Sequence, residues 1–397
     1  MLYLYDDATA RQFQPFALTR PVSELRAGTD VIRARWEHVA GTRASGVIAA
    51  EHLADFDELD APIVVGADTV IPAGAIVVNS RCVVSLYARL DADADTWECA
   101  GAVCAVRLDR DRPARAFDDG TLTLEMLARG SAAPLSGRWL HHVWDVLAQL
   151  TQQLTDDINV HSATVQSITH RGEILGTHTV VVEPDAIIEP HVVFDAHAGP
   201  IRVARNATVS SFTRIVGPCY VGEHATIVGD RIANCSIGDW AKIRGEISSS
   251  IVLGHSNKGH TGFVGHSYLG RWVNLGAGTT TSNLKNTYGT VQLWTPAGVQ
   301  DTGQQFLGTL FGDHTKTGIG TMLNTGTVLS AGANVFGATM PPKYVPPFAW
   351  GDGEPYETFA PDKFVEVAER MMGRRHVLLS DKHRRFLTTV QDLHAGR

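Results

Sequence analysis

A six-residue rhythm in the second half of the chain is the sequence feature that most constrains the fold. Val203, Val209, Ile215, Val221 and Ile227 follow one another at steps of six. An α-helix repeats every 3.6 residues and a β-strand every two, so neither alone explains this spacing. A period of six fits a parallel β-helix, in which each hexapeptide forms one flat face and three faces make a coil.

The same rhythm begins before these positions and continues after them. Val182–Ile187 and Ile188–Val193 are consecutive copies, and Leu269 and Leu275 carry the repeat through a polar stretch. The 38 glycines are concentrated in this half of the chain and punctuate the pattern. We therefore predict a hexapeptide-repeat β-helix over residues 175–350. Because flat faces offer no deep pocket within one chain, we expect ligand sites between neighbouring copies.

Residues 1–155 lack the repeat and indicate a second domain. A chain of 397 residues exceeds the usual limit of a single core. Leu2–Tyr5 and Pro62–Asp68 are apolar runs typical of buried strands, and Ser23–Glu37 has the apolar spacing of a helix. Strands that alternate with a helix indicate an α/β layer architecture.

Acidic residues close the predicted strands of this domain. Asp6 and Asp7 follow the first strand, and Asp68 ends the run that starts at Pro62. The carboxyl ends of strands carry the ligand site in open α/β sheets. Carboxylates there can bind Mg²⁺ that bridges phosphates, with Asp68 as the candidate ligand, or they can simply form turns.

Residues 355–397 are predicted to form a helical cap. Asp362–Met372 has the i, i+3, i+4 apolar spacing of an amphipathic helix, and a second helix follows from about Asp381. A solenoid requires such a cap because its last coil exposes the apolar core.

Charge and composition exclude several classes of partner. The net charge of -8 is spread along the chain, and no Lys/Arg-rich run predicts nucleic-acid binding. No apolar run predicts a membrane span, and the first residues do not resemble a signal peptide. The five cysteines are odd in number and contain no C-x-x-C pair, which argues against disulfides and zinc. We expect a cytoplasmic protein.

One polar stretch within the repeats, His255–Lys285, holds the candidate chemistry. It contains His255, His260 and His266 among glycines and short apolar steps. Histidine titrates near neutral pH and is the natural base for taking a proton from an amine. A transfer to an amine also needs a donor for the developing oxyanion. His260 and His266 both remain candidates for the base, and we expect His255 to be structural.

Leu18–Gly28 resembles the start of a divergent group of sugar-nucleotidyltransferase-like domains. The resemblance implies that Arg20 and Arg26 pair with phosphates, to which the guanidinium fork is suited. The ordinary members carry a Gly-rich loop after the first strand and a downstream Pro-Lys, and both are missing here. Binding without nucleotidyl transfer therefore stays open, as does a role for both arginines as structural ion-pair partners.

Tyr268-Leu-Gly270 and Asn274-Leu-Gly-Ala-Gly-Thr279, followed by Asn283, resemble the bifunctional N-acetylglucosamine-1-phosphate uridyltransferase/glucosamine-1-phosphate acetyltransferase family. This implies an α/β nucleotidyltransferase-like domain followed by a left-handed parallel β-helix with C-terminal helices, assembled as a homotrimer. It also implies that Tyr268, Asn274 and Asn283 hold an amino-sugar phosphate. The turn Gly276, Ala277 and Gly278 would lie by acetyl-CoA as cosubstrate.

Basic residues complete the implied acceptor site. Gly238–Arg244 is similar to the family's segment that supplies a phosphate-binding cation, which assigns that role to Arg244. Arg214 matches the first arginine of the family's clamp, whose second arginine is absent here. Lys285 can replace positive charge lost from a neighbouring turn, and Lys258 can also hold the sugar phosphate.

The family's catalytic histidine lies just before the Tyr-Leu-Gly step. Here an insertion separates His260, which follows an Asn-Lys pair, from His266, which lies two residues before Tyr268. We favour His266, with Asn274 or an N–H of the Gly-Ala-Gly turn as oxyanion donor, and keep His260 as the alternative.

Three functions follow from these observations. The first is an acetyl-CoA-dependent N-acyltransferase acting on an amino-sugar phosphate or a nucleotide-linked amino sugar. The second is a sugar-1-phosphate nucleotidyltransferase whose β-helix only trimerises it. The third is a sugar-nucleotide binding protein without catalysis.

Overall fold

The computed structural model describes residues 1–337 and 340–394, and it divides into two compact units. One comprises Met1–Asp145 with Ser380–Val390, and the other comprises Val146–Leu379 with the residues from Gln391 onward. The predicted ranges were 1–155, 175–350 and 355–397. In the structure the first unit ends at Asp145 and takes in Ser380–Val390, and the residues between 355 and 379 belong to the unit of the solenoid.

The first unit is built on a mixed six-stranded sheet. Its strand order is β11-β8-β9-β6-β1-β4, with β1 parallel to β4 and β6, and β9 antiparallel to β6 and β8. The predicted strand Leu2–Tyr5 is confirmed as β1 and is buried along its length. The strands are β1 (Leu2–Tyr5), β4 (Ala44–Ile48), β6 (Ile76–Asn79), β8 (Thr96–Cys99), β9 (Ala102–Arg107) and β11 (Ala133–Pro134).

The helix predicted over Ser23–Glu37 is wrong in its first half. A 3₁₀ turn at Val22–Glu24 is followed by a short hairpin of β2 (Arg26–Ala27) and β3 (Asp30–Val31), and α1 runs only over Ile32–Ala40. Gly28 has a φ of +70° in this hairpin, a conformation that ends a helix. The remaining short strands of this unit are β5 (Val70–Ile71), β7 (Cys82–Val84), β10 (Arg112–Pro113) and β12 (Gly137–Trp139).

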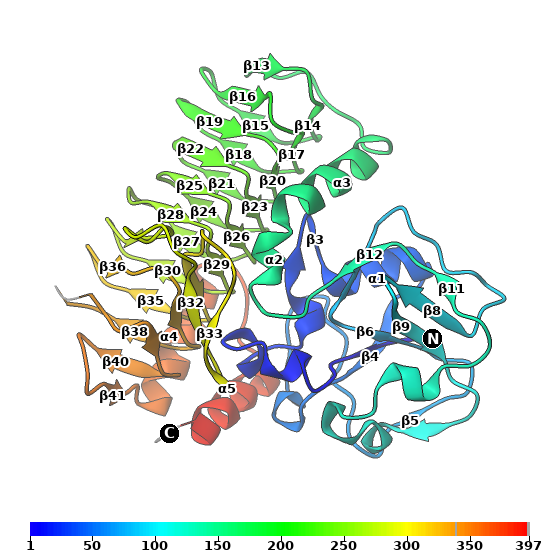
Figure 1. Cartoon of the computed structure of the whole chain (residues 1–397). Coiled ribbons are helices and arrows are strands. Elements are labelled where there is room, and N and C mark those ends of the chain that lie inside the picture. The colour runs from blue at the N-terminus through cyan, green and yellow to red at the C-terminus, as the bar shows by residue number, and fades with distance from the viewer. Residues whose placement is uncertain (338–339, 395–397) are drawn as a thin grey trace. The chain divides into compact units, whose positions relative to one another are not determined.

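The second unit is a parallel β-solenoid of three long faces, seen as stacked coils in Figure 1. We name each face by its first strand. The β13 sheet contains β13 (Glu173–Gly176), β16 (Val193–Ala196), β19 (Thr213–Val216), β22 (Asp230–Ala233), β25 (Ile247–Ser248) and β28 (Val264–Gly265).

The β14 sheet and the β15 sheet are the other two faces. The β14 sheet contains β14 (Val180–Val182), β17 (Ile201–Val203), β20 (Cys219–Val221), β23 (Ser236–Ile237), β26 (Ile251–Val252), β29 (Tyr268–Leu269), β34 (Thr309–Phe311), β37 (Thr327–Leu329) and β39 (Tyr344–Val345). The β15 sheet contains β15 (Ile187–Ile188), β18 (Thr208–Val209), β21 (Thr226–Ile227), β24 (Lys242–Ile243), β27 (Asn257–Lys258), β30 (Asn274–Leu275), β35 (Lys316–Thr317), β38 (Asn334–Val335), β40 (Ala349–Gly351) and the antiparallel β41 (Glu357–Thr358).

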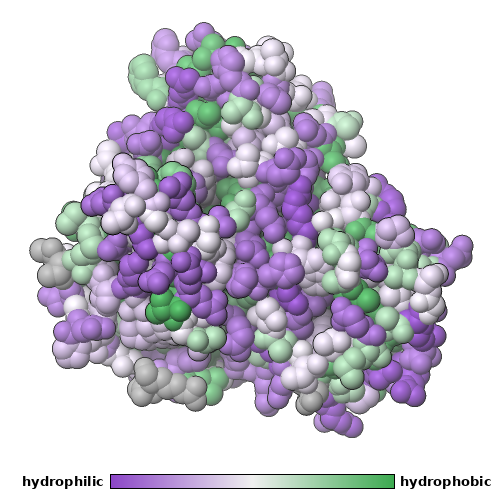
Figure 2. Space-filling view, in the orientation of Figure 1, coloured by the Kyte–Doolittle hydropathy of each residue, from purple (hydrophilic) through white to green (hydrophobic). Residues whose placement is uncertain are grey.

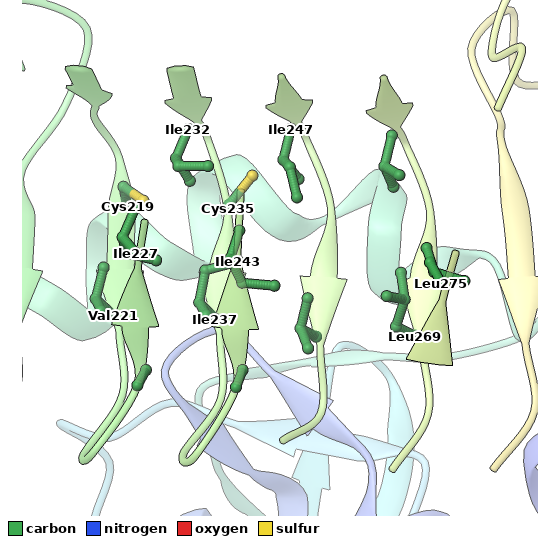
Figure 3. Packing of buried hydrophobic residues seen from close by; sticks show 14 of the residues in the cluster. Cys219, Val221, Ile227, Ile232, Cys235, Ile237, Ile243, Ile247, Leu269 and Leu275 are labelled. Atoms are coloured by element: carbon green, nitrogen blue, oxygen red, sulfur yellow. The ribbon is translucent and has the colours of Figure 1, made fainter. Parts of the chain in front are cut away.

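The six-residue repeat is confirmed as the core of the solenoid. Parallel pairing places Val203, Val221 and Ile237 directly above one another, and all three are fully buried. Figure 3 shows such columns of aliphatic side chains pointing inward from successive coils. At about 25 cal/mol per Å² of buried apolar surface, the repeated column is the main stabilising term of the unit.

A long excursion leaves the solenoid between β31 (Thr280–Thr281) and β34. We call residues 283–307 the excursion; it contains the antiparallel hairpin of β32 (Gln292–Thr295) and β33 (Gly298–Asp301). Trp294 of this hairpin stacks on Tyr344 with ring centroids 3.6 Å apart. The strand β36 (Met322–Leu323) pairs with β31 and resumes the third face.

Helices flank both ends of the solenoid chain segment. α2 (Asp145–Ala148) and α3 (Leu150–Ser162) precede it, and the predicted C-terminal helices are found as α4 (Pro361–Gly373) and α5 (Asp381–His394). α4 covers the last coil, where Phe364 meets Phe348 at 5.1 Å. The part of α5 in the first unit packs Phe386 against Phe56 at 5.8 Å.

Over the part of the chain that the structure describes, no helix is long and apolar enough to cross a membrane. The face in Figure 2 mixes hydrophilic and hydrophobic residues and shows no continuous apolar band.

Candidate functional site

Two corners of the solenoid have opposite contents. At the corner from the β14 sheet to the β15 sheet, residues in the left-handed conformation carry rings that stack from coil to coil. We call this column the aromatic corner, and its stacked members are His224, Trp240, His255, Trp272 and His314. At the corner that leaves the β15 sheet, the corresponding residues from the β21–β22 turn onward are glycines. We call these turns the bare corner, with Gly229, Gly245, Gly262 and Gly278 as its glycines.

The bare corner needs glycine because the coils approach closely there. A Cβ on Gly262 would lie 2.2 Å from the carbonyl oxygen of Thr279, and Gly262 has a φ of +125°. A Cβ on Gly245 would lie 2.7 Å from the carbonyl oxygen of Gly262. Glycine alone permits both the conformation and the approach.

A hollow of about 630 Å³ lies along the bare corner. Its volume is within the range of small-molecule sites. It is formed within a single chain, although the flat faces of a solenoid predicted sites only between copies. The lining residues are Phe212, Arg214, Asp230, Arg231, Gly245, Glu246, Thr261, Gly262 and Phe263.

Two arginines line this hollow, and a third pairs with one of its lining residues. Arg214 lines it and donates to Asp195 at 2.6 Å, and this hydrogen bond, with a second from His197, lowers the pKa of Asp195 to about 2. Arg244 pairs with the lining residue Asp230 at 3.3 Å. Because ion pairs between half-exposed groups contribute little to stability, these guanidinium groups can exchange their partners for a ligand phosphate at small cost.

Arg231 is the other arginine that lines the hollow, and sequence reasoning missed it. It lies directly beside Arg214 in the register of β19 and β22, and its pair with Glu246 is loose at 3.8 Å. The available signal was the strand register: two residues at equivalent positions of adjacent coils project on the same face.

His260 lies beside the hollow and His266 does not. His260 is exposed in the turn from β27 to β28, and the next residues, Thr261 and Gly262, line the hollow. His266 lies at the third corner, between β28 and β29, with a φ of +46°. The preference for His266 as base therefore has no support from the hollow, while His260 has.

His266 instead holds the two ends of the excursion. Its Nδ1 is 2.9 Å from the side-chain nitrogen of Asn283, and its ring stacks on Phe306 at 5.2 Å. Its carbonyl accepts from Gly308 N–H, and Leu307 N–H donates to the Asn283 carbonyl. Burial lowers the pKa of His266, so the neutral imidazole is favoured there.

The other predicted acceptor residues are dispersed. Tyr268 is fully buried in β29. Asn274 accepts a hydrogen bond from Asn257 at 2.9 Å, and Lys285 donates to the Thr290 carbonyl within the excursion. Gly276, Ala277 and Gly278 form the next turn of the bare corner, and the Gly276 and Gly278 N–H groups already donate within the solenoid. These two groups are therefore not free to stabilise an oxyanion.

Lys258 is also unsuited to bind substrate directly. Its side chain is 1% exposed, and its Nζ donates to the carbonyls of Arg244, His260 and Thr261. The site thus brings together Arg214, Arg244 and His260 from the predicted set, adds Arg231, and leaves the remaining polar residues elsewhere.

The arginines predicted to bind phosphate in the first unit are committed to the fold. Arg20 is 1% exposed and forms a bidentate ion pair with Glu58, with both distances 2.8 Å. Arg26 is buried and donates to the Thr29 carbonyl. The alternatives were phosphate binding and structural ion pairing. Arg20 forms a structural ion pair, and both guanidinium groups are buried.

The acidic residues of this unit that were candidates for a magnesium site are engaged in pairs or buried. Asp68 is exposed and paired with Arg115. Asp7 accepts from Arg81 and Asn79, and the buried Asp6 carboxyl has its pKa raised to about 6 by burial. Among the described residues, no group of three or more His, Cys, Asp or Glu could hold a metal ion. No step of the chemistry is derived through Mg²⁺.

Comparisons with known proteins agree with this architecture. Residues 2–165 match the model of a family described as sugar nucleotidyl transferase. The chain is similar to the bifunctional protein GlmU of Ralstonia nicotianae, at 30% identity over 34% of this chain and 32% of that protein. It is similar to GlmU of Synechococcus sp. strain JA-3-3Ab at 29% identity, over 43% of this chain and 27% of that protein. The matched segments span about a third or less of these relatives.

An α/β unit of the sugar-nucleotidyltransferase type joined to a parallel β-solenoid defines the class of this protein. Over part of its length, the chain is similar to the bifunctional protein GlmU. This relationship supports a transferase role in sugar-nucleotide metabolism.

Proposed function

We propose that the solenoid catalyses acetyl-CoA-dependent N-acyl transfer to an amino-sugar phosphate or a nucleotide-linked amino sugar. The observation that carries this proposal is the hollow at the bare corner, which is lined by Arg214 and Arg231 and lies next to the exposed His260. Arg244 pairs with the lining residue Asp230. Arginines suit the phosphate of such an acceptor, and a histidine suits its amine.

The residues take distinct roles in the proposed reaction. Arg214, Arg231 and Arg244 bind the acceptor phosphate, with Asp230 and Glu246 released from their ion pairs. His260 takes the proton from the acceptor nitrogen as that nitrogen attacks the thioester carbonyl carbon. The carbon–sulfur bond then breaks and coenzyme A leaves as the thiol. General-base assistance of this kind contributes a rate factor of about 10²–10⁴.

The acyl donor is placed by resemblance rather than by a cavity. The turn Gly276, Ala277 and Gly278 belongs to the same bare corner as Gly262, one coil further on, and we assign it to the pantetheine arm of acetyl-CoA. The hollow is open on its outer side, and we expect a neighbouring copy in a homotrimer to complete it.

A second candidate is nucleotidyl transfer by the first unit, which the family match over residues 2–165 favours. Arg20 is paired with Glu58 and Arg81 with Asp7, so these arginines give no support to turnover of a triphosphate in this unit. These two activities use different units and can be separated by mutation.

One assay tests the proposal. The purified full chain is offered acetyl-CoA with a panel of amino-sugar phosphates and nucleotide-linked amino sugars, and thiol release is measured. We expect release that falls by about 10² or more in His260→Ala. His266→Ala is the matched control and should keep most of the activity. Loss in His266→Ala but not in His260→Ala would reject the assignment of the base.

The same preparation is offered nucleoside triphosphates with sugar 1-phosphates and Mg²⁺, and pyrophosphate is measured. Pyrophosphate release that survives His260→Ala, without thiol release from any amine, would support the second candidate against the first.

A further inference from the structure

Lys258 breaks the pattern on which the solenoid is built. In the parallel register it follows Ile227 and Ile243 in the inward-facing column of the β15 sheet, and the next coil places Leu275 there. Later coils place Thr317 and Val335 in this column, and among its described residues Lys258 alone carries a charge. Local rules of a fold are most often broken where function requires it.

The ammonium group of Lys258 runs through the interior to the bare corner. Its Nζ donates to the carbonyls of Arg244 and Thr261, each at 3.1 Å, and to the carbonyl of His260. Arg244 belongs to one coil and His260 to the next. One buried cation therefore joins the backbone of Arg244, whose guanidinium pairs with the lining residue Asp230, to the backbone of the exposed histidine.

The bare corner is shaped to admit this ammonium. A Cβ on Gly245 would lie 3.0 Å from Lys258 Nζ and 3.2 Å from the His260 carbonyl oxygen. The glycine thus leaves space for the ammonium and for the hollow on its outer side.

This arrangement is costly for stability. Burial lowers the pKa of Lys258 to about 8, and the negative charge of Asp230 offsets this only in part. Replacing a buried charge by an apolar residue of similar volume is often neutral or stabilising. An aliphatic residue would therefore serve the solenoid better, and a lysine at this position calls for another explanation.

We propose that Lys258 is a positioning residue: by binding the carbonyls of Arg244, His260 and Thr261, it fixes the base and the phosphate-binding arginine on adjacent coils in one arrangement. The catalytic part of this inference rests on the proposed function. The structural part concerns only the turn of residues 259–263 and can be judged without any substrate.

The test compares Lys258→Met, which has similar length without donors, with Lys258→Arg, which keeps charge and donors. Lys316→Met is the matched control. Lys316 also donates to a corner carbonyl, that of His314 at 2.9 Å, but at the aromatic corner. The three variants are measured by thermal unfolding, by hydrogen exchange with mass spectrometry and by steady-state kinetics.

We expect Lys258→Met to unfold at the wild-type Tm or above it, while amides of residues 259–263 exchange about tenfold faster or more. Thiol release should show kcat reduced by about tenfold or more with an unchanged KM for acetyl-CoA, because a misplaced base slows the chemical step. Lys258→Arg should recover part of kcat, and Lys316→Met should match the wild type in exchange at 259–263 and in kcat.

Two outcomes would overturn the inference. Wild-type exchange of residues 259–263 in Lys258→Met would show that the ammonium does not hold the turn. A Tm lowered throughout the solenoid would show that Lys258 serves the fold alone. Failure of the proposed function appears differently, as no thiol release in the wild type, and leaves the exchange measurement to decide the structural part.

Discussion

The aromatic corner and the bare corner both turn through residues with positive φ, but they fill these positions differently. Trp272 has a φ of +62°, is 2% exposed, and lies between His255 and His314 with centroids 4.6 and 6.4 Å away. Gly262 has a φ of +125° and contributes no side chain. The first corner is sealed by its own rings, and the second leaves a hollow that polar side chains of neighbouring strands surround.

The difference shows how a convex solenoid makes a concave site. A β-helix with straight faces has no crevice between layers, so it can create one only by removing side chains along a column. The same removal brings backbone carbonyls of adjacent coils within reach of Lys258. At the aromatic corner, in contrast, the side chains stack between coils. Each ring pair contributes about 0.5–1.5 kcal/mol to stability in addition to the effect of burying its apolar surface.

The largest effect is expected at the aromatic corner, where Trp272→Ala should lower the free energy of unfolding by about 3–5 kcal/mol. The substitution leaves a cavity between His255 and His314, which lose their shared ring contact. Urea unfolding followed by circular dichroism measures the change.

Trp272→His is the matched variant, because His224, His255 and His314 occupy the equivalent position in other coils. It should cost clearly less than Trp272→Ala. Equal losses in the two variants would mean that the stacked column does not stabilise the solenoid.

A feature of this fold is predictable from the sequence when it depends on residues close together in the chain. The inward-facing column was predictable because each hexapeptide contains its own aliphatic residue, such as Val221 or Ile237, at the buried position. The start of α1 was not, because the apolar spacing of Ser23–Glu37 continues through a hairpin that Gly28 permits.

The site was predictable in composition and not in arrangement. Arg214, Arg244 and His260 were all candidates, but the choice between His260 and His266 depends on which corner each occupies. That depends on turn length: residues 259–263 join β27 to β28, whereas 244–246 join β24 to β25. A change of register within one coil moves a side chain from one face to another. The sequence of a single hexapeptide does not reveal such a change. Lys258 was predicted to hold the sugar phosphate, because the sequence does not show that its side chain points into the solenoid.

A smaller effect is expected at the bare corner, where Gly262→Ala should lower the free energy of unfolding by about 2–4 kcal/mol. The new Cβ would overlap the Thr279 carbonyl oxygen in a conformation that L-residues rarely adopt. The coils must separate, so we also expect acyl transfer to fall more than stability alone explains.

Gly278→Ala provides the control within the same corner. Its Cβ would approach nothing closer than 3.7 Å, so only the conformational strain of φ +76° remains. A loss of about 1 kcal/mol is expected. If Gly278→Ala were as damaging as Gly262→Ala in urea unfolding, strain rather than close approach would explain why the corner is bare.

The smallest expected effect is on the pH dependence of stability, and it involves one lysine at each corner, Lys258 and Lys316. Burial lowers the pKa of both Lys258 and Lys316 to about 8, below the ordinary value of 10.5. Between these two pH values the unfolded chain binds more protons than the folded chain, so stability due to these groups rises with pH. Lys258→Met should therefore gain stability over the wild type at pH 7, with the advantage shrinking by about 1–3 kcal/mol toward pH 10.

Lys316→Met should show the same sign and a similar amplitude, because burial lowers the pKa of Lys316 to about 8 as well. The measurement is the free energy of unfolding in urea at several pH values, taken as the difference between each variant and the wild type. A difference that does not depend on pH would mean that the folded protein keeps both ammonium groups charged at their ordinary pKa. The carbonyls of the bare corner would then stabilise the charged ammonium of Lys258 as well as water does. Burying this ammonium would then not lower the stability of the solenoid.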